Sequence, residues 1–198
     1  PAAHDGSLRA HGEALVVALV AAGRHRVIYR PHPRSGVADA EYGAANARII
    51  AAIAQANELD PTAQHIFDDG PSLGWQLAAA DVAIVDISAM VYDRLAAGRP
   101  LLITRPADPR AEVDTSGYLA ACEWLDADRA PEVDAEVERV LGDVDAVARL
   151  DGWVRHYFGD ATHGSATARF HAAVELLMGR WDDWHARSVA NGDDESDP

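Results

Sequence analysis

Two short polar segments carry the residue types that could hold an anionic ligand. Arg30-Pro31-His32-Pro33 follows a β-type run, and Asp86-Ile87-Ser88 follows a second, fully apolar run. Arginine and histidine donate hydrogen bonds to phosphate oxygens, and a serine at a helix start leaves backbone N–H groups facing an anion. Ligands of open α/β sheets bind at the carboxyl ends of strands. Two such turns on one sheet are therefore expected to face one anionic ligand.

The stretch Asp81–Thr104 predicts the structural unit that positions the second turn. An apolar run of strand length, Val82–Val85, precedes a helix that begins after Ser88 and stops at Gly98. A second apolar run, Leu101–Ile103, follows directly. Strand, helix and strand in this order predict a parallel βαβ unit with a polar turn at the end of its first strand.

The remaining segments alternate in the same way, which predicts a doubly wound, parallel-sheet α/β fold with helices on both faces. Trp181 and Trp184 are predicted to pack the last helix onto that sheet. Helices are predicted at 7–22, 40–58, 73–80, 131–141, 144–158 and 165–181, and strands at 26–29, 65–67 and 120–125.

Length and composition predict one domain with a short tail. Residues 1–190 contain enough apolar side chains for one core, while 191–198 are acidic and expected to be disordered. A doubly wound domain usually opens with a strand, whereas the first element predicted here is a helix. We therefore expect a strand, and further chain, before Pro1.

The charge balance excludes several classes of function. The chain has 32 acidic residues against 17 basic ones and a formal net charge of -15, so it lacks the basic face that nucleic-acid binding requires. All the basic residues are arginines, which excludes Schiff-base lysines and a P-loop lysine. With one cysteine and no metal-type Cys/His spacing, neither a metal nor a cofactor is expected. The base-rich stretch Arg24–Arg34 fits a solvated loop rim and a local phosphate site equally well.

Four segments that span nearly the whole chain resemble one known family. The chain resembles the C-terminal half of the CDP-glycerol glycerophosphotransferases, the teichoic-acid primases and polymerases. That family has a strand ending in a His-Pro pair, as at His32, and an Asp-x-Ser-Ser turn, for which this chain has Ser88 followed by Ala89. One hydroxyl of the family turn is therefore absent. The resembling segments are Val27–Pro33, Leu77–Asp93, Gly98–Leu102 and Tyr157–Arg169.

The resemblance implies the Rossmann-like donor-binding domain of a GT-B fold, which binds CDP-glycerol or another nucleotide-diphosphate donor. The whole enzyme would transfer glycerol phosphate to a cell-envelope polymer or a lipid-linked acceptor. An N-terminal acceptor domain, which would also supply the membrane contact, would be missing, so the fragment is expected to be inactive alone. The full-length protein is expected in the cytoplasm, at the inner face of the membrane. A GT-B glycosyltransferase using a nucleotide sugar and a non-catalytic nucleotide-binding module remain as alternatives.

The candidate site residues follow from the two turns and the resemblance. His32 is the candidate catalytic residue, as a donor to a diphosphate oxygen or as a general acid toward the leaving group. Asp86 cannot bind an anion directly and is expected to orient its turn. Each residue also has a structural interpretation: a loop histidine, a solvated arginine, an ordinary N-cap serine. The candidate donor- and phosphate-binding residues are Arg30, Arg34, Ser72, Asp86, Ser88, Ala89, Met90 and Asp108.

Overall fold

The computed structural model describes residues 7–34, 36–106, 108, 110–114 and 116–191. Of the predicted disordered tail, 191–198, Asn191 is helical, and residues 192–198 lie outside the described residues. The chain forms two compact units, Pro1–Val154 and Arg155–Pro198, and their boundary falls inside the range predicted as one domain. Both candidate turns belong to the first unit.

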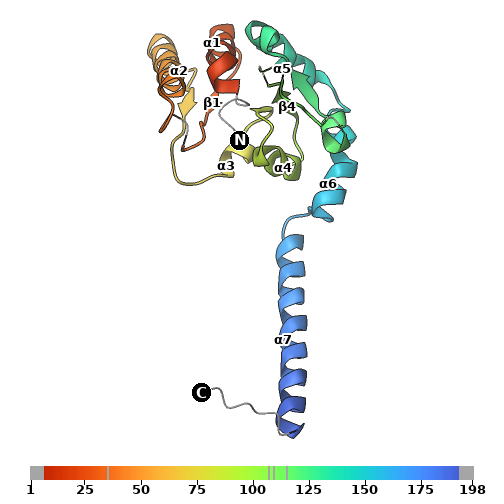
Figure 1. Ribbon diagram of the computed structural model, residues 1–198. Coiled ribbons are helices and arrows are strands. Elements are labelled where there is room, and N and C mark those ends of the chain that lie inside the picture. The colour runs from red at the N-terminus through yellow and green to blue at the C-terminus, as the bar shows by residue number, and fades with distance from the viewer. Residues whose placement is uncertain (1–6, 35, 107, 109, 115, 192–198) are drawn as a thin grey trace. The chain divides into compact units, whose positions relative to one another are not determined.

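The first unit is a mixed α/β structure with two small parallel sheets (Figure 1). One sheet pairs β1 (Ile28–Tyr29) with β2 (Ile66–Phe67). The other has the order β3-β4-β5, formed by β3 (Ala83–Val85), β4 (Leu101–Thr104) and β5 (Glu123–Leu125). The α/β class is confirmed, with all described strand pairs parallel.

The expectation that both turns follow strands of one hydrogen-bonded sheet is wrong. Arg30 follows β1 in the two-stranded sheet, and Asp86 follows β3 in the three-stranded sheet. Pro31 and Pro33 have no backbone N–H and cannot extend the β1 ladder, which is one reason why that strand is so short.

Helices connect the strands of the first unit close to where the sequence predicts them. A π-helical turn, Leu8–Gly12, leads into the first α-helix, which ends where Gly23 adopts a left-handed conformation with φ 66°. The carboxylate of Asp39 caps α2 by accepting from the N–H groups of its first turn. The helices are α1 (Glu13–Ala22), α2 (Ala40–Leu59), α3 (Trp75–Ala79), α4 (Ala89–Ala96) and α5 (Val133–Gly142), with 3-10 turns at Gly117–Ala121, Ala127–Glu132 and Ala148–Leu150.

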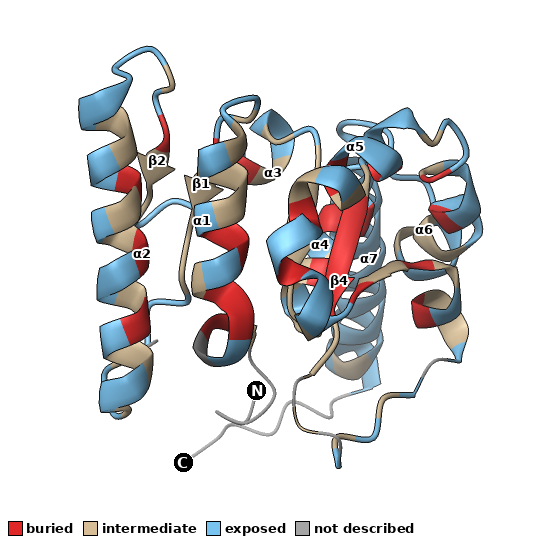
Figure 2. Ribbon diagram, turned by 90° about the horizontal axis from the view of Figure 1, so that it is seen from above, coloured by how far each residue is buried: buried red, intermediate tan, exposed pale blue. Residues whose placement is uncertain are grey.

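Helix α1, whose buried residues are marked in Figure 2, contributes apolar side chains to two hydrophobic clusters. On the side of α5, Leu102 of β4 packs with Leu125 and with the buried face of α5. On the side of α2, Ile49 and Ile53 pack with Val27. Leu19 of α1 contacts both clusters, so α1 joins the parts of the unit that carry the two candidate turns.

Helix α6 (Asp151–Phe158) spans the boundary of the two units, and the second unit consists largely of α7 (Ser165–Asn191). Trp181 and Trp184 are 61% and 52% exposed, and their rings are tilted by 33° with centroids 5.0 Å apart. No residue of α7 is buried, and the packing of these rings onto the sheet of the first unit stays a prediction. Among the described residues, no helix combines the length and the apolarity that a bilayer crossing requires.

Candidate functional site

The turn after β1 begins with an arginine whose charge is already paired. The Arg30 guanidinium donates to the Asp68 carboxylate at 2.5 Å and to the Gly70 carbonyl at 2.8 Å. Gln76 donates to the same carboxylate, and these two hydrogen bonds lower the pKa of Asp68. Arg30 therefore joins the end of β1 to the loop after β2, and its cation is largely neutralised before any ligand binds.

His32, in contrast, presents a free donor at the surface. Its Nδ1 accepts the backbone N–H of Arg34 at 3.1 Å, which requires an unprotonated Nδ1 and, in the neutral ring, a proton on Nε2. The ring is exposed, and Nε2 has no hydrogen-bond partner among the described residues. The guanidinium of Arg34 is also exposed, with no ion-pair partner in the described part of the chain. Both side chains can therefore donate to an anion that arrives from solvent.

The loop that carries His32 is anchored on α2 through two glycines. Gly36 has φ +82°, and a Cβ atom at this position would lie 2.7 Å from the Cα of Gly43. Only glycine fits this backbone approach without strain. The contact fixes the loop four residues after His32, immediately before Asp39 caps α2.

The turn after β3 ends in the helix cap that the sequence predicts. Ser88 has extended φ and ψ angles, and its Oγ accepts the backbone N–H of Met90 at 3.3 Å. Ala89 is the first residue of α4 and is exposed. The positive end of the α4 dipole therefore lies at this turn. The cap is confirmed, while the role of Ser88 and Met90 toward a phosphate stays a prediction.

Asp86 orients the turn through contacts with two distant segments. Its Oδ1 accepts the Thr104 hydroxyl at 2.5 Å and the backbone N–H of Ser7 at 3.2 Å. These bonds tie the ends of β3 and β4 to the start of the first helix, in line with the expected orienting role. The nearby ring of His11 is buried. Burial lowers the pKa of His11, and the negative charge of Asp86 offsets part of that shift. Neither ring nitrogen of His11 has a hydrogen-bond partner in the described structure.

A buried arginine, which the sequence analysis did not single out, positions α4. Arg94 is fully buried and donates to the carbonyls of Leu77 at 2.6 Å, Ala80 at 3.0 Å, Asp81 at 2.8 Å and Pro100 at 3.1 Å. Burial lowers the pKa of Arg94 to about 10, which leaves it charged at neutral pH. This side chain links the end of α3 and the entries of β3 and β4 to the helix that displays Ser88.

The two remaining candidates have local interactions. Ser72 is exposed, and its carbonyl accepts from Gln76 at 3.1 Å. The carboxylate of Asp108 accepts two hydrogen bonds from the Arg110 guanidinium, at 3.0 and 2.8 Å. No contact in the described structure joins Ser72 or Asp108 to His32 or Ser88.

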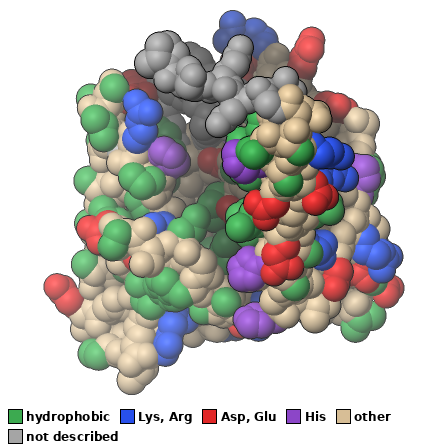
Figure 3. All heavy atoms as spheres, turned by 90° about the horizontal axis from the view of Figure 1, so that it is seen from below, with side chains coloured by type: hydrophobic (Ala, Val, Ile, Leu, Met, Phe, Trp, Pro, Cys, Tyr) green, Lys and Arg blue, Asp and Glu red, His purple; other side chains and the backbone are tan. Residues whose placement is uncertain are grey.

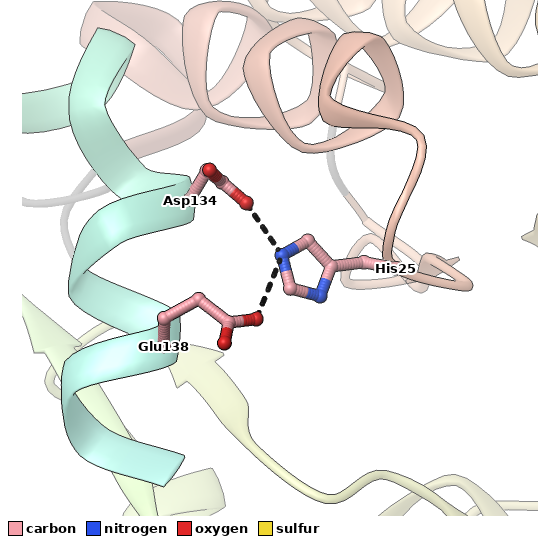
Figure 4. Close-up of side chains that lie close together, drawn as sticks. All are labelled: His25, Asp134 and Glu138. Carbon is pink, nitrogen blue, oxygen red and sulfur yellow. Dashed lines mark hydrogen bonds and ion pairs between the residues drawn. The ribbon is translucent and has the colours of Figure 1, made fainter. Parts of the chain in front are cut away.

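One group of metal-ligand side chains gathers in the described structure, although the sequence gives no reason to expect it. His25, Asp134 and Glu138 place their ligand atoms within 4.8 Å of one another (Figure 4). The separation of 109 positions in the sequence between His25 and Asp134 explains why no spacing motif marks them. None of the three belongs to either strand-end turn.

The surface charge agrees with the composition. Figure 3 shows acidic, basic and histidine side chains intermixed on one face, without a continuous basic patch on it. Comparison of the chain with models of protein families, with curated proteins and with solved structures found no match in any of the three.

Proposed function

We propose that this chain is the donor-binding domain of a glycerophosphotransferase that takes glycerol phosphate from CDP-glycerol. In this proposal the small parallel sheets and α1 form the equivalent of one doubly wound, GT-B-type domain. The observation that supports it most strongly is the display of His32 Nε2–H and the Arg34 guanidinium directly after β1. No described residue accepts a hydrogen bond from His32 Nε2 or from the Arg34 guanidinium.

The chemistry of group transfer from a nucleotide diphosphate explains why such donors are needed. As the bond to the transferred group breaks, negative charge grows on the departing nucleotide, and fixed hydrogen-bond donors stabilise that charge. His32 is proposed to donate its Nε2 proton to a phosphate oxygen of the donor. Arg34 adds a planar guanidinium suited to two parallel hydrogen bonds with phosphate.

The turn after β3 is proposed to supply the second half of the phosphate site. Backbone N–H groups and the dipole at the start of α4 attract an anion without bringing a full positive charge. Since Ala89 has no hydroxyl, Ser88 would carry the side-chain contact at this turn. Arg94 would hold the helix at a fixed position, as a positioning residue that never touches the ligand.

Transfer itself is proposed to need a second domain. An acceptor and its base must be held opposite the donor for the reaction to proceed at a useful rate. The acceptor would be a cell-envelope polymer or a lipid-linked glycerol phosphate chain. In this proposal the described chain alone binds the donor and transfers little or nothing.

Binding calorimetry on the full chain tests the proposal. We expect saturable binding of CDP-glycerol and CDP that is unchanged by EDTA, and weaker binding of UDP. His163→Ala, at an exposed histidine between α6 and α7, is the matched control for His32→Ala. A folded sample that binds no nucleotide diphosphate would contradict the proposal, and a preference for UDP and UDP-sugars would favour a glycosyltransferase domain instead.

A further inference from the structure

The cluster of His25, Asp134 and Glu138 has the chemistry and the geometry of a transition-metal site. His25 Nε2 lies 2.8 Å from Asp134 Oδ1 and 3.8 Å from Glu138 Oε1. Ligands of a tetrahedral Zn²⁺ ion, each about 2.1 Å from the metal, lie about 3.4 Å from one another. The two observed distances bracket this value and all three ligand atoms lie within 4.8 Å of one another, so side-chain rotations can bring them to bonding distance of one ion.

We propose that His25, Asp134 and Glu138 form a binding site for a divalent transition-metal ion, with Zn²⁺ as the best fit. One imidazole nitrogen and two carboxylate oxygens suit Zn²⁺, whereas Mg²⁺ and Ca²⁺ prefer oxygen ligands alone. Three protein ligands leave the fourth tetrahedral position to water. The site is independent of the proposed nucleotide site, which uses none of these residues.

The local structure brings the ligands to a common point (Figure 4). Asp134 and Glu138 are four residues apart on α5, so their side chains project from the same helix face. His25 follows the left-handed Gly23 that ends α1, and the α1–α5 packing brings its ring to that face. A bound ion would therefore link two elements of the first unit that are far apart in the sequence.

The surroundings favour an ion that exchanges with solvent. The His25 side chain is 15% exposed and that of Glu138 is 50% exposed, so the cluster is open on the Glu138 side. Arg24 donates to Oδ2 of Asp134 and leaves Oδ1 facing His25. Hydrogen bonds of this kind orient metal-binding carboxylates in known sites. Both the His25 and the Arg24 hydrogen bonds lower the pKa of Asp134, so this ligand is ionised at neutral pH.

Zinc titration of the metal-free full chain tests the site. At pH 7.5 we expect one Zn²⁺ per chain by calorimetry, a higher melting temperature with Zn²⁺, and no response to Mg²⁺. Co²⁺ should give the intense visible absorption of a four-coordinate ion. Since metal ligands must be deprotonated to bind, the Zn²⁺ affinity should fall as the pH is lowered.

Glu138→Gln is the decisive variant because Glu138 is half exposed and its side chain makes only the 3.8 Å contact with His25 among those described. We expect at least a tenfold loss of Zn²⁺ affinity with an unchanged melting temperature in the absence of metal. His25→Gln should abolish binding. Glu175→Gln and His171→Gln are the matched controls, because an exposed histidine and an exposed carboxylate lie one turn apart there on α7.

Two results would overturn the assignment. In one, Glu138→Gln and His25→Gln bind Zn²⁺ as the parent chain does. In the other, the α7 control variants lose the binding, which would place the ion on the exposed helix. Folding failure of His25→Gln leaves the test intact, because Glu138→Gln decides it separately.

Discussion

The imidazole Nδ1 of His32 accepts the backbone N–H of Arg34 at 3.1 Å. This one bond fixes the tautomer of the ring and directs the proton of the neutral imidazole to Nε2, on the side away from the loop backbone. Pro31 and Pro33 restrict the backbone on either side of the histidine. The loop therefore holds a hydrogen-bond donor ready at the surface without using it in the fold.

His32→Ala is expected to weaken CDP binding while leaving the protein equally stable. Loss of one hydrogen bond to a charged phosphate costs about 1.5–3 kcal/mol, roughly a 10- to 150-fold change in affinity. The ring is exposed, so its removal creates no cavity. Calorimetry and thermal melting on the same samples separate the two effects. A drop in melting temperature with unchanged affinity would identify His32 as a structural loop residue.

Ser88→Ala is expected to change stability and affinity together. The lost cap on Met90 N–H costs about 1 kcal/mol of the free energy of unfolding. Ser88→Gly is a useful companion, because glycine caps helices nearly as well and restores most of that stability. If Ser88 also contacts phosphate, both variants bind CDP more weakly by a similar factor. Normal affinity in the glycine variant would limit Ser88 to its role as a cap.

Arg94→Lys is expected to destabilise the first unit although it preserves the charge. A lysine ammonium cannot reach all four carbonyls that the guanidinium bonds, and each buried carbonyl left without a partner costs about 1–3 kcal/mol. Urea denaturation measures the loss. Arg99→Lys is the control, since Arg99 forms an exposed ion pair with Asp81 that is worth less than about 1 kcal/mol. Equal stability of the two variants would refute this account of Arg94.

Stability is expected to fall as the pH drops from 8 to 5.5, because burial makes two histidines harder to protonate in the fold than in the unfolded chain. Burial is the largest cause that lowers the pKa of His11 and of His65 below the ordinary histidine value of about 6.5. The unfolded chain therefore binds more protons below about pH 6.5, and proton binding favours unfolding. The aspartates with lowered pKa values change the stability only near or below pH 4, which lies outside the interval from pH 8 to 5.5.

The contribution of His65 to this pH dependence of stability can be tested separately with a substitution. Its Nδ1 accepts the Val27 N–H at 3.1 Å, a bond that a proton on Nδ1 would break. His65→Asn should therefore flatten the dependence of the urea midpoint on pH, even if it lowers stability at pH 8. The exposed His163→Asn should leave the slope unchanged. An equally steep slope in His65→Asn would exclude His65 as a source of the pH dependence.

Local signals were sufficient to predict the elements around the second turn, whereas the strand predicted at 26–29 before the first turn is observed only at Ile28–Tyr29. The predicted strand Val82–Val85 and the Ser88 cap agree with β3 and α4 to within one residue, because strand length, cap and stop are all encoded within a few residues. The last helix was predicted to end at Trp181 but continues to Asn191. No proline or glycine interrupts the intervening residues, and the next residue is a glycine.

Contacts between distant segments were not predictable in the same way. Asp86 meets Ser7 across 79 positions, and His25 meets Asp134 across 109. Neither pair has a spacing signal, because the packing of α1 against its neighbours creates the contacts. Arg94 was also missed, since an arginine between Val91 and Leu95 on an apolar helix face gives no sign of which carbonyls it will bond.

The most direct test of the central claim is a map of backbone amide shifts on the isotopically labelled chain titrated with CDP. The account predicts that the amides of both turns, those of Arg30, His32 and Arg34 and those of residues 87–90, respond along one binding curve with a single dissociation constant, while the amides of His25 and Glu138 stay unchanged. Perturbation of only one turn, or two curves with different constants, would contradict a shared diphosphate site. No perturbation at either turn in a folded sample at saturating CDP would contradict donor binding altogether.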